Sequence, residues 1–353
     1  MENDRASTGH APVAIVLVTW NAAAFLEGCL GSLRALARPP QELVVVDNDS
    51  RDGSVEIVRR RFPGANVLEL GLNAGFCHAN NVGIRATRAP FVLVLNPDTR
   101  LEPGFVDNLL PAFDDPRVGM AAGKLLRFDG ATLDSCGQTL ARSRRSLDRG
   151  YGRPDRGQFD RDEPVFGVCG AAGLYRRSML EAIALAPGEY FDERFFAYGE
   201  DLDLAWRAQR RGWRGAYRFR ARGLHARGGS VARRAGARRF LAVLARPPEV
   251  RFHIVKNRSL TLLRNESVLG FLRGLPFIFV RDVATFLLLL VTSPGVLLRL
   301  WRSRGVFFDA WRRRSLDSAS LAHHVESGDA QGQAAVGDRP RPAAERPGDP
   351  GHA

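Results

Sequence analysis

Short apolar runs alternate with amphipathic segments along the first part of the chain. Apolar and β-branched residues fill positions 13–19, 43–46, 67–70, 91–95 and 118–126, and each run predicts a strand. Between the runs, segments 22–36, 53–62, 76–85 and 103–113 carry apolar residues at helical spacing. This alternation predicts an α/β fold with a parallel sheet and right-handed crossovers.

The pattern weakens after residue 126. Residues 130–164 are rich in Arg, Gly and Asp, and they indicate either a long excursion over the active face or a poorly ordered segment. Strand character returns at 165–175. Helices at 177–184 and 201–211 and a last strand at 213–219 follow, and this strand leads to His225.

A different pattern begins beyond residue 232. Segment 275–298 is strongly apolar, but Arg281, Asp282 and Pro294 interrupt it. Its longest uncharged stretch, 283–298, has 16 residues, whereas a membrane-spanning helix needs about 20. An interfacial or re-entrant helix pair is therefore favoured over a true span.

The two ends of the chain lack a globular pattern. Residues 1–12 are polar and have no apolar core of a signal peptide, and residues 315–353 are rich in Ala, Arg, Gly, Asp and Pro. We expect a disordered lead at 1–12, a catalytic domain at 13–232, a basic and apolar helical region at 233–314 that associates with membranes, and a disordered tail at 315–353.

Positive charge is concentrated in one segment. The formal net charge is +13, and segment 233–314 holds 17 Lys and Arg residues against four acids, so this segment accounts for the whole excess. Its Arg residues alternate with apolar runs, which favours an anionic membrane surface over a nucleic acid as partner.

The cysteines indicate a reducing compartment. The chain has four of them, Cys29, Cys77, Cys136 and Cys169, and none forms a CxxC pair. This scatter argues against a zinc site and a disulfide framework and predicts buried free thiols.

Acidic residues follow two of the predicted strands. Asp47 ends the strand at 43–46, Asp98 follows the strand at 91–95, and an isolated Glu200-Asp201 pair comes later. Open α/β sheets bind ligands at the carboxyl ends of their strands. Acids gathered there indicate a divalent metal, a phosphorylated ligand and one acid left as a base, which points to sugar transfer from a nucleotide donor.

A series of short motifs runs through the same region. It comprises Val-Thr-Trp-Asn at 18–21, Val-Asp-Asn-Asp-Ser at 46–50, Leu-Asn-Ala-Gly-Phe at 72–76, Asn-Asn-Val-Gly at 80–83, Leu-Asn-Pro-Asp at 95–98, Gly-Ala-Ala-Gly-Leu-Tyr at 170–175, Phe-Ala-Tyr-Gly-Glu-Asp at 196–201, and His225 before Gly229-Ser230. In the order of its motifs and the residues that they contain, the series resembles family 2 inverting glycosyltransferases, in particular their rhamnosyltransferase-like bacterial branch. The resemblance implies a GT-A fold, a single nucleotide-binding Rossmann-like α/β domain.

The resemblance implies a role for Asp47 in nucleotide binding. Its carboxylate would accept a hydrogen bond from the imide N–H of a uracil or thymine base, and Thr19 and Asn21 would line the same pocket. The alternative is that Asp47 caps the next helix.

A second set of residues is expected to contact the donor's ribose or phosphates. Asn73, Gly75 and Asn81 form a polar, Gly-containing turn into a helix, where free backbone amides suit such oxygens. A plain loop would use the same residues.

A divalent cation, Mg²⁺ or Mn²⁺, is the implied cofactor. Asp98 resembles the last acid of a DxD metal motif, and Asn96 stands where the motif has its first acid, so one ligand charge is missing. By resemblance, His225 is the third metal ligand or contacts the diphosphate. The alternatives are a turn cap for Asp98 and an ordinary core or surface histidine for His225.

The catalytic base is assigned to Asp201, with its neighbour Glu200 as the second candidate. Inverting transfer needs one carboxylate to take the proton of the acceptor hydroxyl, although an acid at a helix start is ordinarily a partner of the helix dipole. Gly170, Ala171 and Ala172 would let the acceptor approach the backbone, or would simply permit tight strand packing.

These features predict a metal-dependent inverting glycosyltransferase attached peripherally to the cytoplasmic face of the cell membrane. It would transfer a sugar, with rhamnose favoured, from a dTDP or UDP donor to a lipid-linked or cell-wall glycan acceptor. The first alternative is a sugar nucleotidyltransferase, although 20–24 is not the Gly-rich basic loop that such enzymes place after the first strand. The second is a basic scaffold that binds membranes or nucleic acids.

Overall fold

The structure is a computed structural model that describes residues 11–227 and 246–312. The predicted tail, the 232/233 boundary and most of the predicted lead lie outside the described residues, as do Gly229 and Ser230. Ala11 and Pro12, which we expected in a disordered lead, belong to the first strand.

One half of the central sheet is parallel, as the sequence predicts. β1 (Ala11–Thr19) lies between β2 (Pro40–Asp47) and β4 (Phe91–Leu95), and β3 (Asn66–Glu69) pairs with β2. The register places Thr19 opposite Asp47. The ends of these strands therefore share one carboxyl edge of the sheet.

The other half of the sheet is mixed, which corrects the expectation of an all-parallel sheet. β11 (Ala172–Arg176) lies antiparallel between β4 and β6 (Val118–Leu126). β12 (Arg214–His225) is parallel to β6, and β10 (Glu163–Val165) is antiparallel to β12. The predicted strand at 165–175 is two strands, because the chain leaves the sheet between Val165 and Ala172. An apolar run alone does not reveal such a break.

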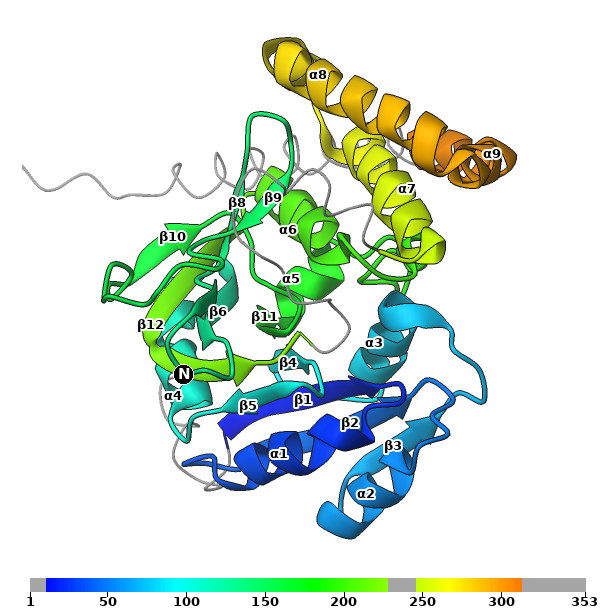
Figure 1. The fold of residues 1–353 in the computed structure, drawn as a ribbon. Coiled ribbons are helices and arrows are strands. Elements are labelled where there is room, and N and C mark those ends of the chain that lie inside the picture. Colours follow the sequence, from blue (N-terminus) through cyan, green and yellow to red (C-terminus); the bar gives the residue numbers. More distant parts are fainter. Residues whose placement is uncertain (1–10, 228–245, 313–353) are drawn as a thin grey trace, which may run out of the picture.

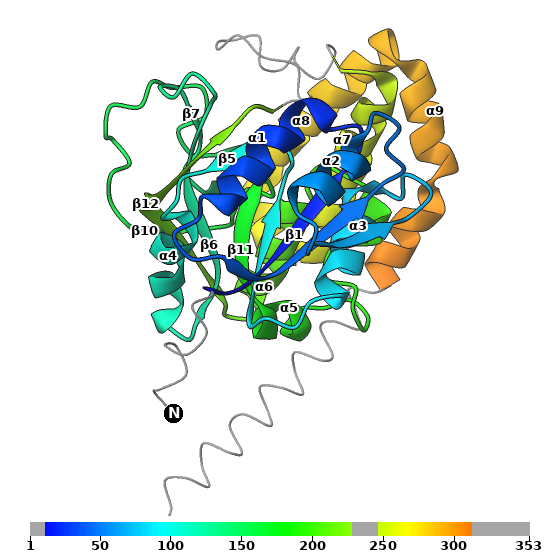
Figure 2. The same cartoon turned by 90° about the horizontal axis from the view of Figure 1, so that it is seen from below.

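Helices cover both faces of the sheet (Figures 1 and 2). One face packs against α1 (Ala23–Arg34), α2 (Ser54–Arg61) and α4 (Phe105–Leu109), with a 3-10 turn at Leu110–Asp114. The other packs against α3 (Gly75–Arg85), α5 (Arg177–Ala182) and α6 (Glu200–Arg210). Successive residues of β1 point to opposite faces, so Ile15 lies in the first core and Val16 in the second.

Residues 130–164 form short strands beside the carboxyl edge. β7 (Leu133–Ser135) pairs with β6, β8 (Gln138–Leu140) and β9 (Ser146–Asp148) form a hairpin, and β5 (Thr99–Leu101) pairs with β12. The Gln138 amide contacts Asp201. The alternative of a poorly ordered segment is therefore wrong, and the contact with Asp201 agrees with an excursion over the face that carries the candidate base.

Three helices follow the α/β domain: α7 (Pro248–Asn265), α8 (Val268–Thr292) and α9 (Pro294–Arg302). Figure 1 shows α7 beside α6, with α8 and α9 farther out. α8 runs for 25 residues through Pro276, Arg281 and Asp282. The helix is therefore longer than the uncharged stretch of 16 residues, because Arg281 and Asp282 do not end it. Among the described residues, α8 is the helix whose length and composition would let it cross a membrane.

The thiols are free, as the sequence predicts. Cys29, Cys77 and Cys136 are buried, and Cys169 is half-buried. Burial raises the pKa of Cys29 to about 12, so this thiol is not a reactive thiolate at neutral pH.

Candidate active site

Thr19 and Asp47 form a buried polar recess where β1 and β2 end. One carboxylate oxygen of Asp47 accepts a hydrogen bond from the backbone N–H of Ser50 at 2.8 Å. The other oxygen, Oδ1, and the Thr19 hydroxyl are buried and have no hydrogen-bond partner within the described residues. A buried polar atom without a partner is costly, so this recess is suited to a ligand that donates hydrogen bonds.

Asn21 lies at the exposed rim of this recess. Its φ of 48° is in the left-handed region, which Asn tolerates better than most residues. Its backbone N–H donates to Ser50 Oγ at 2.9 Å, and its side-chain oxygen accepts from the backbone N–H of Arg51 at 2.9 Å. These bonds tie the loop after β1 to the loop after β2.

Asn73 and Gly75 form the turn that opens α3. Asn73 Oδ1 accepts from the backbone N–H of Gly75 at 3.1 Å. Gly75 has a φ of +88°, and a Cβ there would lie 2.8 Å from the backbone oxygen of Phe196. Glycine is therefore required for this turn to touch the loop that precedes Glu200.

Asn81, which we expected to contact the nucleotide, makes its hydrogen bonds with the loop at 190–193. It is fully buried, and its side-chain oxygen accepts from the backbone N–H groups of Tyr190 and Phe191 at 3.1 and 2.9 Å. Its amide nitrogen donates to Phe191 O and to Glu193. With its oxygen and amide bonded, Asn81 holds the 190–193 loop in place.

Asp98 and His225 lie side by side where β4 and β12 end. His225 Nε2 is 3.3 Å from Asp98 Oδ1, and His225 Nδ1 is 2.8 Å from Asp134 Oδ2. Burial lowers the pKa of His225, but the hydrogen bonds to Asp134 and Asp98 outweigh this effect and raise the pKa to about 9. Asn96 is half-buried on the same loop, and its backbone N–H donates to Ala171 O.

This pair is compatible with a divalent cation that takes its other ligands from a diphosphate. Within the described residues, no three His, Cys, Asp or Glu side chains gather as a closed metal site. A cation that binds there would displace the proton of His225 Nε2, because an imidazole must be neutral to act as a ligand. The Asp98 oxygen and the imidazole nitrogen on one side would then leave the remaining coordination positions for phosphate and water. The Asp134 carboxylate behind His225 orients the ring, as is usual for a ligating histidine.

Glu200 and Asp201 begin α6 and have different surroundings. Asp201 Oδ2 accepts from Gln138 Nε2 at 2.7 Å and from the backbone N–H of Gly170 at 3.3 Å, and Oδ1 accepts from the backbone N–H of Leu202 at 2.8 Å. Glu200 is buried, and its Oε2 has no partner within the described residues.

Both carboxyl groups favour the protonated form more than usual. Burial raises the pKa of Glu200 to about 8, and the charge of Asp201 adds to this shift. Burial and the charge of Asp148 also raise the pKa of Asp201, while the hydrogen bond from Gln138 opposes the change. Perturbed acids of this kind are typical of active sites.

Only one of the three residues proposed to contact the acceptor lies against the acids. A Cβ at Gly170 would lie 3.8 Å from both Asp201 Cβ and Glu200 Oε1. Ala171 and Ala172 are buried in the hydrophobic core, which agrees with the packing alternative for these two residues.

The sequence did not indicate the residues that support the two acids from behind. Gln138 comes from the weakly patterned segment. Asn257 of α7 donates through its amide nitrogen to the carbonyls of Phe195, Ala197 and Tyr198 at 3.0, 2.7 and 2.8 Å. Asn257 lies beyond the series of motifs that carries the family resemblance, so its contacts become visible only in the assembled fold.

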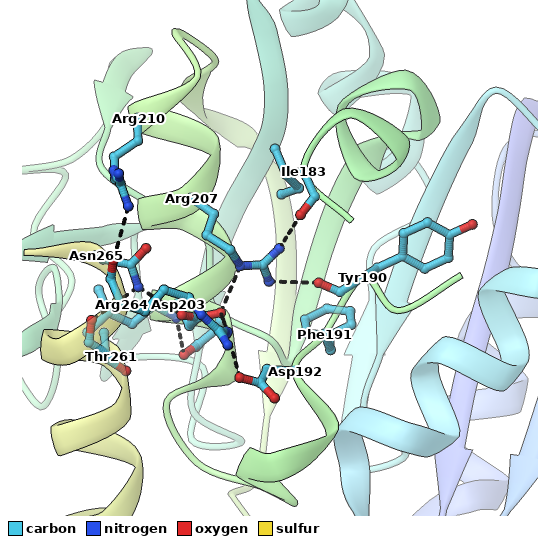
Figure 3. A network of polar contacts seen from close by, with 12 residues as sticks. Ile183, Tyr190, Phe191, Asp192, Asp203, Arg207, Arg210, Thr261, Arg264 and Asn265 are labelled. Carbon is cyan, nitrogen blue, oxygen red and sulfur yellow. Dashed lines mark hydrogen bonds and ion pairs between the residues drawn. The ribbon is translucent and has the colours of Figure 1, made fainter. Parts of the chain in front are cut away.

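A buried ionic network joins α6 to α7 (Figure 3). Arg207 Nε donates to Asp203, one helical turn earlier, at 2.8 Å. Arg264 Nη1 contacts Asp192 at 2.5 Å, and Asn265 donates to Asp203 at 2.8 Å. These contacts thus fix α6, which carries the candidate base, against α7, which comes later in the chain.

Comparison with known proteins identifies the family to which the chain belongs. Residues 14–184 match the family described as Glycosyl transferase family 2. The N-acetylglucosaminyl-diphospho-decaprenol L-rhamnosyltransferase of Mycobacterium tuberculosis is 32% identical over 248 residues, which cover 62% of this chain and 77% of that protein. The low-salt glycan biosynthesis hexosyltransferase Agl10 of Haloferax volcanii is 23% identical, over 56% of this chain and 62% of that protein.

The fold comparison agrees with the expected GT-A fold. The crystal structure of GalNAc-T7 with UDP, GalNAc and Mn²⁺ aligns with a TM-score of 0.52 at 12% identity, over 71% of this chain and 47% of that one. Similarity at this level concerns the fold alone. Together with the sequence relatives, it establishes that the chain has a GT-A-like α/β fold and belongs to glycosyltransferase family 2.

Proposed function

We propose that the protein is a metal-dependent inverting glycosyltransferase that transfers a sugar, with rhamnose favoured, from a dTDP or UDP donor to a lipid-linked or cell-wall glycan. The observation that carries the proposal is the gathering of a base recess, a candidate cation site and a perturbed carboxyl pair at one edge of the sheet. Membership of a glycosyltransferase family argues against both a nucleotidyltransferase and a non-enzymatic scaffold.

Nucleotide recognition is assigned to the recess at the ends of β1 and β2. The free Oδ1 of Asp47 accepts the imide N–H of thymine or uracil, and the Thr19 hydroxyl supplies a second polar contact. Asn21, Asn73 and Gly75 shape the rim, and Asn96 is assigned to the donor's phosphates. The N1–H and amino group of guanine also donate to a carboxylate, so Asp47 favours thymine or uracil over guanine only weakly.

Leaving-group stabilisation is assigned to Asp98 and His225. A divalent cation bound there would neutralise the charge that develops on the donor's diphosphate. Asp134 accepts the Nδ1–H of His225 and so keeps Nε2 directed toward Asp98.

Proton transfer is assigned to Asp201. Its hydrogen bonds from Gln138 and Gly170 hold the carboxylate beside the small residue that leaves room for an acceptor hydroxyl. The carboxylate takes the hydroxyl proton as the acceptor oxygen attacks the anomeric carbon from the face opposite the leaving diphosphate. Attack from that face inverts the configuration.

The sugar and acceptor are proposed by analogy with the relative that is 32% identical, whose name describes rhamnose transfer to a diphospho-decaprenol-linked N-acetylglucosamine. With this chemistry we place the protein at the cytoplasmic face of the cell membrane. The catalytic domain occupies 13–232, and the basic helical region 233–314 attaches it to the anionic surface.

Thermal stabilisation by nucleotides tests the donor site. We expect dTDP or UDP to raise the Tm in the presence of Mn²⁺ more than in its absence, and more than GDP does, because a ligand that binds only the folded state stabilises it. In Asp47→Asn the side-chain amide keeps an acceptor oxygen but has no charge. This variant should therefore show a smaller nucleotide-induced rise in Tm and remain folded. Absence of any shift with all three nucleotides would contradict the proposal.

The base is tested by comparing Asp201→Asn with Glu200→Gln. Loss of a general base typically lowers kcat about 10²- to 10⁴-fold, so Asp201→Asn should lose transfer in this range and keep the nucleotide-induced rise in Tm. Full activity of Asp201→Asn would rule out the assigned role. A larger loss in Glu200→Gln would transfer that role to Glu200.

A further inference from the structure

A cationic pocket lies beside the start of α6. It has a volume of about 210 Å³ and is lined by four arginines from three separate elements. Arg144 and Arg145 come from the turn of the β8–β9 hairpin, Arg258 from α7 and Arg281 from α8. Figure 1 shows this hairpin reaching toward α8.

The arginines of this pocket are only partly neutralised. Arg144 pairs with Glu266, and Arg258 pairs with Asp282 at 2.6 Å. One guanidinium nitrogen of Arg281 is buried without a hydrogen-bond partner within the described residues, and its distance to Asp282 is 3.8 Å. The Arg281 guanidinium therefore keeps a buried N–H donor for which the described residues supply no acceptor, and an anion with several oxygens would satisfy it.

The pocket adjoins the loop that leads into the candidate base. Tyr198 and Gly199 line it, and Gly199 immediately precedes Glu200. The hairpin that carries Arg144 at its turn bonds Asp201 through Gln138 at its root. Residues Thr19, Asp47 and Asp98 of the donor recess do not line this pocket, so its anion is not the donor's diphosphate.

Apolar surface lies next to the cationic pocket. A cavity of about 450 Å³ between α7 and α8 is lined by Leu262, Phe271, Leu275 and Phe279. Asp282, the ion-pair partner of Arg258, also lines it. An anionic group and a hydrocarbon chain can therefore bind side by side.

We propose that the arginine pocket binds the diphosphate of a polyisoprenoid-linked acceptor, with its hydrocarbon chain against the α7–α8 cavity and its sugar directed toward Asp201. This inference rests on the proposed function and adds to it the site that recognises the acceptor. Its ligand chemistry is an organic diphosphate. Free pyrophosphate and an anionic phospholipid headgroup share part of that chemistry, so the experiment must separate these sources.

The test uses Arg281→Gln and a matched control, Arg273→Gln. Both substitutions remove one positive charge from α8, but Arg273 is exposed and does not line the pocket. Binding of farnesyl diphosphate to the full chain is measured by thermal shift in EDTA, so that no divalent cation recruits the probe to Asp98 and His225. We expect the probe to raise the Tm of the parent protein and of Arg273→Gln, with affinity for Arg281→Gln lower by about tenfold or more, since a charged hydrogen bond is lost.

Two further probes identify the source of the anion. Inorganic pyrophosphate with farnesol should bind more weakly than farnesyl diphosphate, because no hydrocarbon chain is attached to it, and this weak binding should also depend on Arg281. Vesicles of phosphatidylglycerol should not distinguish Arg281→Gln from Arg273→Gln. Equal, Arg281-dependent binding of pyrophosphate would overturn the assignment to a lipid, and Arg281-dependent binding of the vesicles would assign the pocket to a phospholipid headgroup.

Kinetics give a second readout. With a diphosphate-linked acceptor, Arg281→Gln should raise the acceptor KM about tenfold or more and leave the donor KM unchanged. With a glycoside acceptor of the same lipid length but no phosphate, the parent and Arg281→Gln should have equal KM values, and an equal rise for both acceptors would overturn the proposal. The rise in Tm with dTDP or UDP and Mn²⁺ reports the donor site separately, so failure of the pocket and failure of the proposed function are distinguishable.

Discussion

Glu200 and Asp201 are adjacent in sequence, and their surroundings give them different hydrogen-bond partners. Asp201 accepts hydrogen bonds from Gln138 and from two backbone N–H groups, which favour its charged form. Glu200 has a buried oxygen without a partner within the described residues. Each charge raises the pKa of the neighbouring carboxyl group, so near neutral pH the pair as a unit is expected to hold an extra proton.

The raised pKa of Glu200 predicts a pH-dependent stability. Its pKa is about 8 in the folded protein, against 4.5 for a glutamate in water, so the folded state binds the extra proton between these values. The free energy of unfolding must then fall as pH rises from about 4.5 to 8, by about 1.4 kcal/mol per unit at most. Glu200→Gln removes the titration and should reduce this slope.

Urea unfolding at pH 5, 6, 7 and 8 measures the effect. The difference in unfolding free energy between Glu200→Gln and the parent should move in favour of the variant as pH rises. Glu193→Gln is a suitable control, because the pKa of Glu193 is lowered rather than raised. Parallel profiles for the parent and Glu200→Gln would show that Glu200 titrates normally.

Sequence reasoning found the residues that end strands and missed those that depend on distant partners. The positions of Asp47 and Asp98 follow from apolar runs that stop at a carboxylate, which is a local signal. Asn81 carries no local sign that its amide bonds the backbone 109 residues away. Gln138 lies in a segment without periodicity, so its contact with Asp201 becomes visible only once the sheet is assembled.

At the scale of elements, the loop before α6 is strained and α7 holds it. Phe196 and Tyr198 have φ values of 65° and 75°, a region that costs bulky residues about 1–3 kcal/mol each. Asn257 bonds three carbonyls of this loop, and His253 stacks on Phe196 at 5.0 Å. Contacts from α7 therefore compensate for the strain that sets the direction of Glu200 and Asp201.

Removal of the Asn257 amide should lower turnover more than donor binding. In Asn257→Ala the loop loses three hydrogen bonds and relaxes, and a shift of about 1 Å at a catalytic group can cost about 10²-fold in rate. The nucleotide recess does not contact Asn257, so the nucleotide-induced rise in Tm should remain. Measurement of kcat and donor KM separates the two effects.

Two further variants show whether the hydrogen bonds are responsible. Ser259→Ala removes a bond within α7 itself and should leave kcat near that of the parent. Asn257→Asp keeps the size but replaces the donating nitrogen with a second acceptor facing carbonyls, so it should be at least as impaired as Asn257→Ala. Normal kcat in both Asn257 variants would show that the loop is positioned by other contacts.

The same scale shows where prediction of the fold reached its limit. Long runs such as Phe91–Leu95 and Val118–Leu126 were predicted with the bounds that the structure has. The antiparallel insertion of β11 between them was not predicted, because strand direction depends on which neighbours pair and not on the composition of the strand. The short strands β7 to β9 likewise depend on the strands with which they pair, and their own composition does not predict them.

At the scale of the whole molecule, charge and exposed apolar surface coincide at the C-terminal helices. Val280, Leu287 and Val291 of α8 share one face and are 68%, 54% and 84% exposed. Arg299 and Arg302 follow on α9. An exposed apolar face of this kind beside basic residues is typical of a membrane-binding surface.

Replacement of this apolar face should release the protein from membranes. The variant Val280→Gln, Leu287→Gln and Val291→Gln keeps the charge and removes three side chains that would each contribute about 1.5–3 kcal/mol when fully buried in lipid. Partitioning onto phosphatidylglycerol vesicles should therefore fall about 100-fold or more in a flotation assay. The Tm in solution should stay close to that of the parent, because these side chains are largely exposed in the fold.

Salt distinguishes the two contributions to binding. Arg302→Gln with Arg304→Gln should weaken binding at low salt and little at 1 M salt, where the Debye length is about 3 Å, whereas the apolar variant should be impaired at both. Recovery of the full-length parent in the soluble fraction, without binding to vesicles at low salt, would contradict attachment through α8 and α9. It would also remove the reason for a hydrocarbon chain beside the arginine pocket, so this assay constrains the acceptor as well as the location of the enzyme.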